Sequence, residues 1–164
     1  MSLIAQLSSA LTRLIGFSSP TPRTVALSGP DGISLAIDFV AVDSMSCSLR
    51  EIRLQVPALV DADFDTLKTW GENLCKQVTY LLENIGPLEL DPDGGQVLIR
   101  SNPPDKQGGK TTFYEIVLQS QSGGNFTLRR YQADKTTPGH TQVDIQTTHE
   151  VLKKLVGDLI ATIP

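Results

Sequence analysis

The sequence predicts one α+β domain over residues 1–164, with an antiparallel, meandering β-sheet that carries helices on one face. The expected order of elements is α-βββ-α-βββββ-α. Three segments repeat apolar residues at the three- and four-residue steps of a helix. Between them lie short segments of alternating polarity, separated by turns rich in Gly, Pro and Asp. Short strands joined by turns pair antiparallel, and alternating polarity leaves one side of the sheet in water.

The first element is a short helix that Ser2 can cap and Gly16 can end. Residues 1–22 are therefore expected to form an N-terminal helix and a linker rich in Ser and Pro. One face of this helix is apolar enough to require a partner, either the body of the domain or another subunit. That face carries Leu3, Leu7, Ala10, Leu11 and Leu14.

Three strands are expected next, at residues 25–27, 33–39 and 45–56. The apolar residues of the third strand change from odd to even positions along its length. A side-chain period of two cannot change phase without an irregularity, so we expect a β-bulge near Arg50 and Glu51.

A long central helix is predicted from Phe64 to Ile85. Its apolar side chains fall on one arc, its first turn is acidic, and Gly86 followed by Pro87 would end it. On this helix Trp70 is expected at the margin of the apolar arc and Tyr80 on the side that faces water.

The second half of the chain predicts five strands and a final helix. The strands are expected at residues 88–90, 97–100, 111–119, 125–131 and 142–146. Thr147 and Glu150 have the spacing of a capping box at the start of the helix. Its apolar stripe comprises Val151, Leu152, Leu155, Val156, Leu159, Ile160 and Ile163.

Charge and composition restrict the classes of function. The net charge is −4, made up of −6 over residues 1–99 and +2 over residues 100–164, and this acidic total argues against nucleic-acid binding. No apolar run has the length of a membrane span, and residues 1–17 make a poor signal peptide, so a cytoplasmic location without membrane contact is expected. Cys47 and Cys75 are too few for a disulfide framework.

One acidic segment has the residue spacing of a metal-binding loop. Asp61, Asp63, Asp65 and Glu72 occupy positions 1, 3, 5 and 12 of a calcium-binding EF-hand loop. The glycine that the loop requires is replaced by Thr66, and the helical pattern continues through it. We therefore favour an acidic helix start, and we expect no cofactor.

The best candidate for a binding site is a group of basic residues in the second half of the chain. A functional interpretation is a site for an anionic ligand or an acidic partner, and the alternative is a charged edge on the wet face of the sheet. The group consists of Arg100, Lys106, Lys110, Arg129 and Arg130, with Tyr131 among them.

The sequence contains no nucleophile elbow and no metalloprotease motif, and its two histidines lie in a loop and at a helix start. We therefore predict a non-enzymatic, protein-binding domain of the adaptor or chaperone kind, with a homodimer among the expected assemblies. The alternative is a small-ligand-binding protein or an enzyme with a pocket between sheet and helices. The order of elements resembles that of the small acidic chaperones of type III secretion systems. This resemblance implies dimers that bind extended segments of a client protein, and it identifies no site residue.

Overall fold

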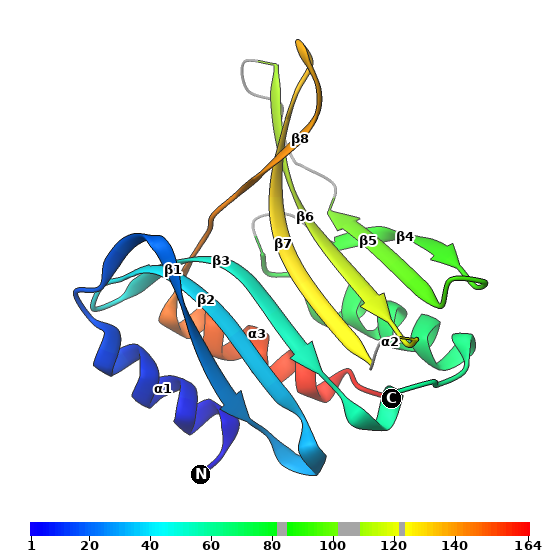
Figure 1. The fold of residues 1–164 in the computed structure, drawn as a ribbon, viewed down its shortest axis with the longest axis horizontal. Coiled ribbons are helices and arrows are strands. Elements are labelled where there is room, and N and C mark those ends of the chain that lie inside the picture. The colour runs from blue at the N-terminus through cyan, green and yellow to red at the C-terminus, as the bar shows by residue number, and fades with distance from the viewer. Residues whose placement is uncertain (82–84, 102–108, 122–123) are drawn as a thin grey trace.

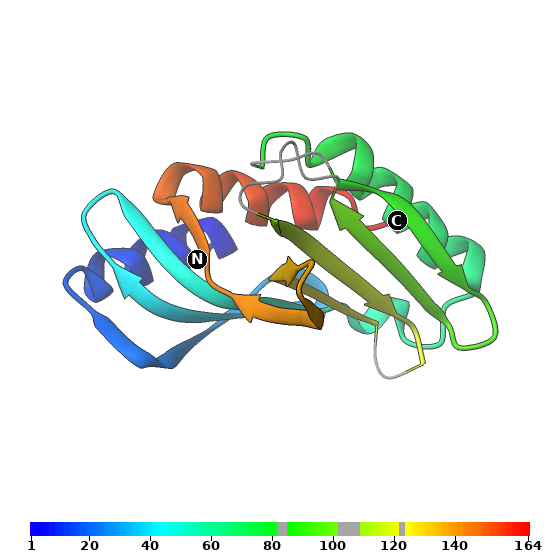
Figure 2. The same ribbon diagram turned by 90° about the horizontal axis from the view of Figure 1, so that it is seen from above.

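Residues 1–81, 85–101, 109–121 and 124–164 are described in the computed structural model, where nine strands form one antiparallel sheet and three α-helices cover one of its faces (Figures 1 and 2). This arrangement confirms the predicted α+β class and the approximate order of elements. The elements are α1 (Leu3–Leu14), β1 (Ser18–Ser28), β2 (Ser34–Val42), β3 (Ser46–Gln55), α2 (Phe64–Gln77), β4 (Ile85–Asp91), β5 (Gln96–Ser101), β6 (Lys110–Gln119), β7 (Asn125–Asp134), β8 (Thr137–Val143), β9 (Ile145–Thr148) and α3 (His149–Ala161).

The sheet divides at the middle of β3. The main strand order is β1-β2-β3-β7-β6-β5-β4, with β8 beside β7 and β9 beside β3. Residues 52–55 of β3 pair with β7, whereas residues 46–49 pair with β9. Arg50 is the extra residue between these two sets, because Asp38 pairs with Glu51 while Phe39 pairs with Leu49. The predicted bulge is thus confirmed, and it marks the point where β3 changes partner.

Beyond this point a three-stranded ribbon projects from the body of the sheet (Figure 1). We call it the arm; it comprises residues 110–114 of β6, 130–134 of β7 and 137–143 of β8. At its base Gln142 Nε2 donates to the carbonyl oxygen of Arg50 at 2.9 Å, and Arg50 Nε lies 2.8 Å from Asp144 Oδ1. These contacts tie the arm to the bulge.

The three helices bury their apolar stripes in the chain's own core. Ser2, Asp63 and Thr148 cap them, each accepting a hydrogen bond from a backbone N–H three residues later. Helix α1 packs on β1 and on α3, α2 packs on β4, β5 and β6, and α3 also contacts α2. The apolar face of the N-terminal helix is buried against the body of the domain. Its partner is therefore the domain itself and not another subunit.

The central helix is eight residues shorter than predicted. It ends at Gln77, residues 82–84 lie outside the described part of the chain, and Ile85 begins β4. Gly86 and Pro87 therefore lie in a strand rather than at a helix end. Val78 is fully buried, and Tyr80 donates to Asp158 Oδ2 on α3 at 2.6 Å instead of facing water. These tertiary contacts outweigh the helical spacing of the last apolar residues.

Other boundaries also differ from the predicted ones. Residues 18–22, expected as a linker, begin β1, where prolines are tolerated because β1 is an edge strand. The strand predicted at residues 142–146 is divided between β8 and β9. Thr148 rather than Thr147 caps α3, and Trp70 is fully buried rather than marginal. The described strands number one more than expected before α3 because the segment after β7 folds back as β8.

Candidate functional site on the open face of the sheet

The helices cover one face of the sheet, and in the described part of the chain no other element covers the opposite face (Figure 2). Side chains alternate between the two faces along each strand. Leu35, Leu54 and Phe126 point to the helices and are fully buried, so their neighbours in sequence point away from them. We call this second face the open face. It carries most of the polar chemistry of the sheet.

On the part of the open face formed by β2 and β3, Arg53 makes two ion pairs. Arg53 Nη1 lies 2.6 Å from Asp38 Oδ2 and 3.1 Å from Glu51 Oε2. Thr24 donates to the other oxygen of Asp38 at 2.6 Å. The hydrogen bond from Arg53 is the largest cause that holds the pKa of Asp38 below its usual value. Asp38 is therefore held as a carboxylate.

The same pattern continues across β7, β6 and β5. Arg129 Nη2 lies 2.9 Å from Glu51 Oε1, and Arg100 Nε lies 3.2 Å from Glu115 Oε2. Glu115 is also the cross-strand partner of Arg129. Three cations and three anions thus alternate over five strands. We call this row the charge ladder; its members are Asp38, Arg53, Glu51, Arg129, Glu115 and Arg100.

Three aromatic rings adjoin the charge ladder at the base of the arm. The ring centroids of Tyr131 and His140 are 4.5 Å apart, and that of Phe113 lies 5.9 Å from Tyr131 and 5.7 Å from His140. We call these rings the aromatic patch. It touches the ladder at two points. Arg100 Cζ is 5.7 Å from the centroid of Phe113, and Arg129 Nη1 donates to the Tyr131 hydroxyl at 3.4 Å.

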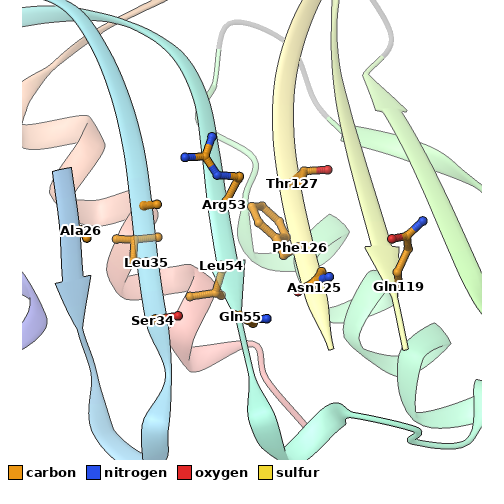
Figure 3. A pocket seen from close by; sticks show the side chains of 11 residues that line it. Ala26, Ser34, Leu35, Arg53, Leu54, Gln55, Gln119, Asn125, Phe126 and Thr127 are labelled. Atoms are coloured by element: carbon orange, nitrogen blue, oxygen red, sulfur yellow. The ribbon is translucent and has the colours of Figure 1, made fainter. Parts of the chain in front are cut away.

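At the other end of the charge ladder the open face is hollowed (Figure 3). The hollow has a volume of about 360 Å³. Its lining combines small side chains on β1 and β2, polar side chains on β3, β6 and β7, and the apolar Leu35, Leu54 and Phe126. Arg53 belongs to both the hollow and the ladder. The small and polar lining residues include Ala26, Ala36, Arg53, Gln55, Gln119 and Thr127.

The structure distributes the predicted basic group over three places. Arg100, Arg129 and Tyr131 meet on the open face. Arg130 points to the opposite face, where its Cζ lies 4.8 Å from the ring centroid of Tyr114 and Nη2 donates to Thr112. Lys110 begins the arm strand of β6, and Lys106 lies outside the described residues.

Sequence reasoning missed six members of the charge ladder and the aromatic patch: Asp38, Glu51, Arg53, Glu115, Phe113 and His140. The alternation of Glu51 and Arg53 on a predicted strand does place them on one face. Their partners Asp38 and Arg129 lie 13 or more residues away, so the cluster is visible only when the strands are paired.

The acidic residues of the EF-hand spacing do not form a loop: Asp61, Asp63 and Asp65 lie at or just before the start of α2, and Glu72 lies inside it. Asp63 caps α2 by accepting from Thr66 N at 2.8 Å, and the helix runs without interruption from Phe64 past Glu72. The hydrogen bond from the Thr66 hydroxyl, followed by the one from its backbone N–H, lowers the pKa of Asp63. Among the described residues no three His, Cys, Asp or Glu side chains are grouped as a metal site.

Neither cysteine lies on the open face as a ready nucleophile. Burial is the largest cause that raises the pKa of the Cys47 thiol to about 12, and burial also raises the pKa of Cys75. Both thiols are therefore protonated at neutral pH. The chemistry that the open face does offer is hydrogen bonding, charge and aromatic contact.

No family model, curated protein or solved structure matches this chain. In the part of the chain that the structure describes, no helix combines the length and apolarity needed to cross a membrane. The candidate site therefore rests on its own geometry.

Proposed function

We propose that this chain is a non-enzymatic protein-binding domain, of the adaptor or chaperone kind, whose open face binds its partner. The observation that carries this proposal is an uncovered sheet face that displays a charge ladder over five strands next to an aromatic patch. Arginine and aromatic side chains are the types enriched in protein interfaces and in their energetic centres. The helices have already used their apolar stripes in the core, so the open face is the surface left for recognition.

The hollow beside Arg53 favours a second candidate function. Its volume of about 360 Å³ falls at the lower end of the range for small-molecule sites. Under this alternative a small polar ligand occupies the hollow. Native mass spectrometry of the purified chain separates the two, since a ligand adds a fixed mass that a protein-binding surface does not require.

A steric block tests the proposal directly. Thr127 lies in the hollow between Arg53 and Val117, its cross-strand partners. Thr127→Trp would fill the hollow, whereas Thr12→Trp adds the same side chain to an exposed position of α1. A tagged chain should lose its co-purifying protein with Thr127→Trp and keep it with Thr12→Trp. The reverse pattern would place the partner on the helix layer and contradict the proposal.

We also propose a cytoplasmic location and assembly as a homodimer. Both cysteines are free, which suits the reducing cytoplasm. A homodimer would appear in light scattering at twice the 17.8 kDa of one chain. A single species of 17.8 kDa would contradict the homodimer. It would not contradict the binding of a partner by the open face.

A further inference from the structure

We infer that the segment bound by the open face is an extended, acidic polypeptide whose carboxylates are spaced about three residues apart, with each carboxylate bound by one arginine of the charge ladder. This inference rests on the proposed function and adds the charge and the spacing of the partner.

The charge ladder is neutral in total but not toward solvent. The side chains of Arg100 and Arg129 are 44% and 42% exposed, whereas those of their partners Glu115 and Glu51 are each 13% exposed. Arg53 is 38% exposed above Asp38 at 16%. A molecule that approaches the open face therefore meets guanidinium groups, and the carboxylates that balance them lie beneath.

The recessed carboxylates also hold the arginines in position. Arg100 uses its Nε–H for Glu115, and among the described residues its two Nη groups make no hydrogen bond. Arg100 therefore still offers N–H donors in the planar fork that matches a carboxylate. Each nitrogen of the Arg129 guanidinium already makes one contact, and its two Nη groups each keep a second N–H. Side chains that are already ordered lose less conformational entropy on binding. The ladder is thus prepared for an anion before the anion arrives.

The strand spacing sets the distance between neighbouring binding positions. Arg100 on β5 and Arg129 on β7 are separated by one intervening strand, and strands lie about 4.8 Å apart, so the two positions are about 10 Å apart. A segment in the extended polyproline II conformation rises about 3.1 Å per residue and turns once every three residues, so side chains three residues apart lie on the same side, about 9 Å apart. A peptide that crosses the strands would then place one carboxylate at Arg100 and the next at Arg129. It would continue toward Arg53, which lies on the adjacent strand and opposite Thr127, and toward the hollow.

The aromatic patch lies beside this path and extends the recognition. Phe113 and Tyr131 each contact an arginine of the ladder. An apolar or aromatic residue of the partner that flanks its carboxylates would pack on these rings. The chain as a whole is acidic, at −4, so attraction for anions is confined to the exposed arginines, which favours a short acidic segment over a long polyanion such as a nucleic acid.

Three synthetic probes test the spacing and the sign of charge on the full chain. The first is a fluorescent twelve-residue peptide with Glu at every third position and Ser and Gly between. The second has the same composition with its Glu residues adjacent, and the third has Lys in place of Glu. We expect the spaced acidic peptide to bind at least about threefold more tightly than the clustered one, and the Lys peptide not to bind.

Two charge-neutral double variants test the arginines without changing the net charge. R100Q/E115Q and R129Q/E51Q each remove one exposed cation together with its recessed anion, and R13Q removes an exposed arginine from α1 as the control. We expect each double variant to weaken the spaced acidic peptide about fivefold, as for a partly exposed ion pair, and R13Q to leave it unchanged. Thermal unfolding of each variant verifies its fold.

The outcomes separate this inference from the proposed function. If neither acidic peptide binds, if spacing has no effect, or if the double variants bind as the parent chain does, the inference is wrong. The Thr127→Trp experiment can still support a protein partner of other chemistry. If a single-stranded oligonucleotide displaces the spaced peptide and binds more tightly, the ladder recognises phosphate, and the acidic-polypeptide inference fails.

Discussion

Gly124, which directly precedes β7, holds the start of β7 against the residue that follows β3. Its φ of +64° lies in the left-handed region, and its carbonyl oxygen accepts from Val56 N at 3.0 Å. A Cβ at this position would collide with the backbone oxygen of Val56. Gly124→Ala is therefore expected to lower the free energy of unfolding by about 2 kcal/mol or more, measured by urea denaturation.

Gly157 provides the matched control for that measurement. It lies inside α3, and a Cβ there would meet no atom within 4 Å. Gly157→Ala should raise the free energy of unfolding by about 0.5–1 kcal/mol, because alanine favours the helix and restricts the unfolded chain. Equal effects of the two substitutions would contradict the geometry of the turn at Gly124.

Asp38 is expected to make the stability of the fold depend on pH. The pKa of its carboxyl is lowered in the folded state, chiefly by the hydrogen bond from Arg53. A group with a lowered folded pKa stabilises the fold above its unfolded pKa of about 3.9, and this contribution disappears as the pH falls through the folded value. Between pH 5 and pH 2 the free energy of unfolding should therefore fall less in Asp38→Asn than in the parent chain. Denaturation at a series of fixed pH values measures this difference. Identical slopes would show that the pairing with Arg53 contributes nothing.

At the scale of single residues the site could be predicted only in part, as two neighbouring arginines show. Arg129 and Arg130 are adjacent in sequence, yet the strand places one on the open face and the other on the opposite face. Alternation along β7 would have separated them. The recessed partners Glu51 and Glu115 could not be assigned without knowing which strands pair.

At the scale of elements, the junction after α2 depends on Tyr80. Its hydroxyl donates to Asp158 at 2.6 Å, and Lys154 Nζ lies 4.5 Å from its ring centroid. Burial, followed by the contact with Asp158, raises the pKa of Tyr80 and keeps it protonated. Tyr80→Phe keeps the ring and should lower the free energy of unfolding by about 1–2 kcal/mol in urea denaturation. A change within experimental error would mean that the hydroxyl is not part of the junction.

The arm is expected to open more easily than the rest of the sheet. Gln142 ties β8 to the bulge at Arg50, and the arm strands beyond it have no helix beneath them in the described structure (Figure 1). Gln142→Ala should speed amide hydrogen exchange about five- to tenfold in residues 137–143 and change the midpoint of unfolding little.

Gln132→Ala is the control for the arm. It lies on β7 within the same ribbon, and its side chain makes no hydrogen bond in the described part of the chain. Exchange in residues 137–143 should be unchanged in this variant. If both variants accelerate exchange equally, the contact with Arg50 does not hold the arm.

The elements themselves were predictable where a local signal was strong. Ser2, the apolar stripe of α1 and the phase change at Arg50 each indicated a feature that the structure contains. The end of α2 was not, because Val78 and Ile85 continue a helical spacing although they are buried outside the helix. The contacts of Gln77 and Tyr80 with Asp158 on α3 mark where the chain leaves the helix.

At the scale of the whole molecule, the sequence predicted the layers but not the division of the sheet. Alternating polarity and three apolar stripes are sufficient to predict helices on one face and water on the other. The arm and the shared role of β3 arise from pairings between distant segments, such as β3 with β9. These pairings bring Glu51, Arg129 and Tyr131 together, and so they create the site.

Photo-crosslinking from both faces of the molecule tests the central claim most directly. A benzoylphenylalanine at Gln55 or Val117 would lie on the open face, and one at Ser9 or Glu150 would lie on the helix layer. In cells that produce the chain, the two open-face positions should give an adduct with the same polypeptide, and the two helix positions should not. Adducts confined to Ser9 and Glu150 would contradict the claim that the open face binds the partner.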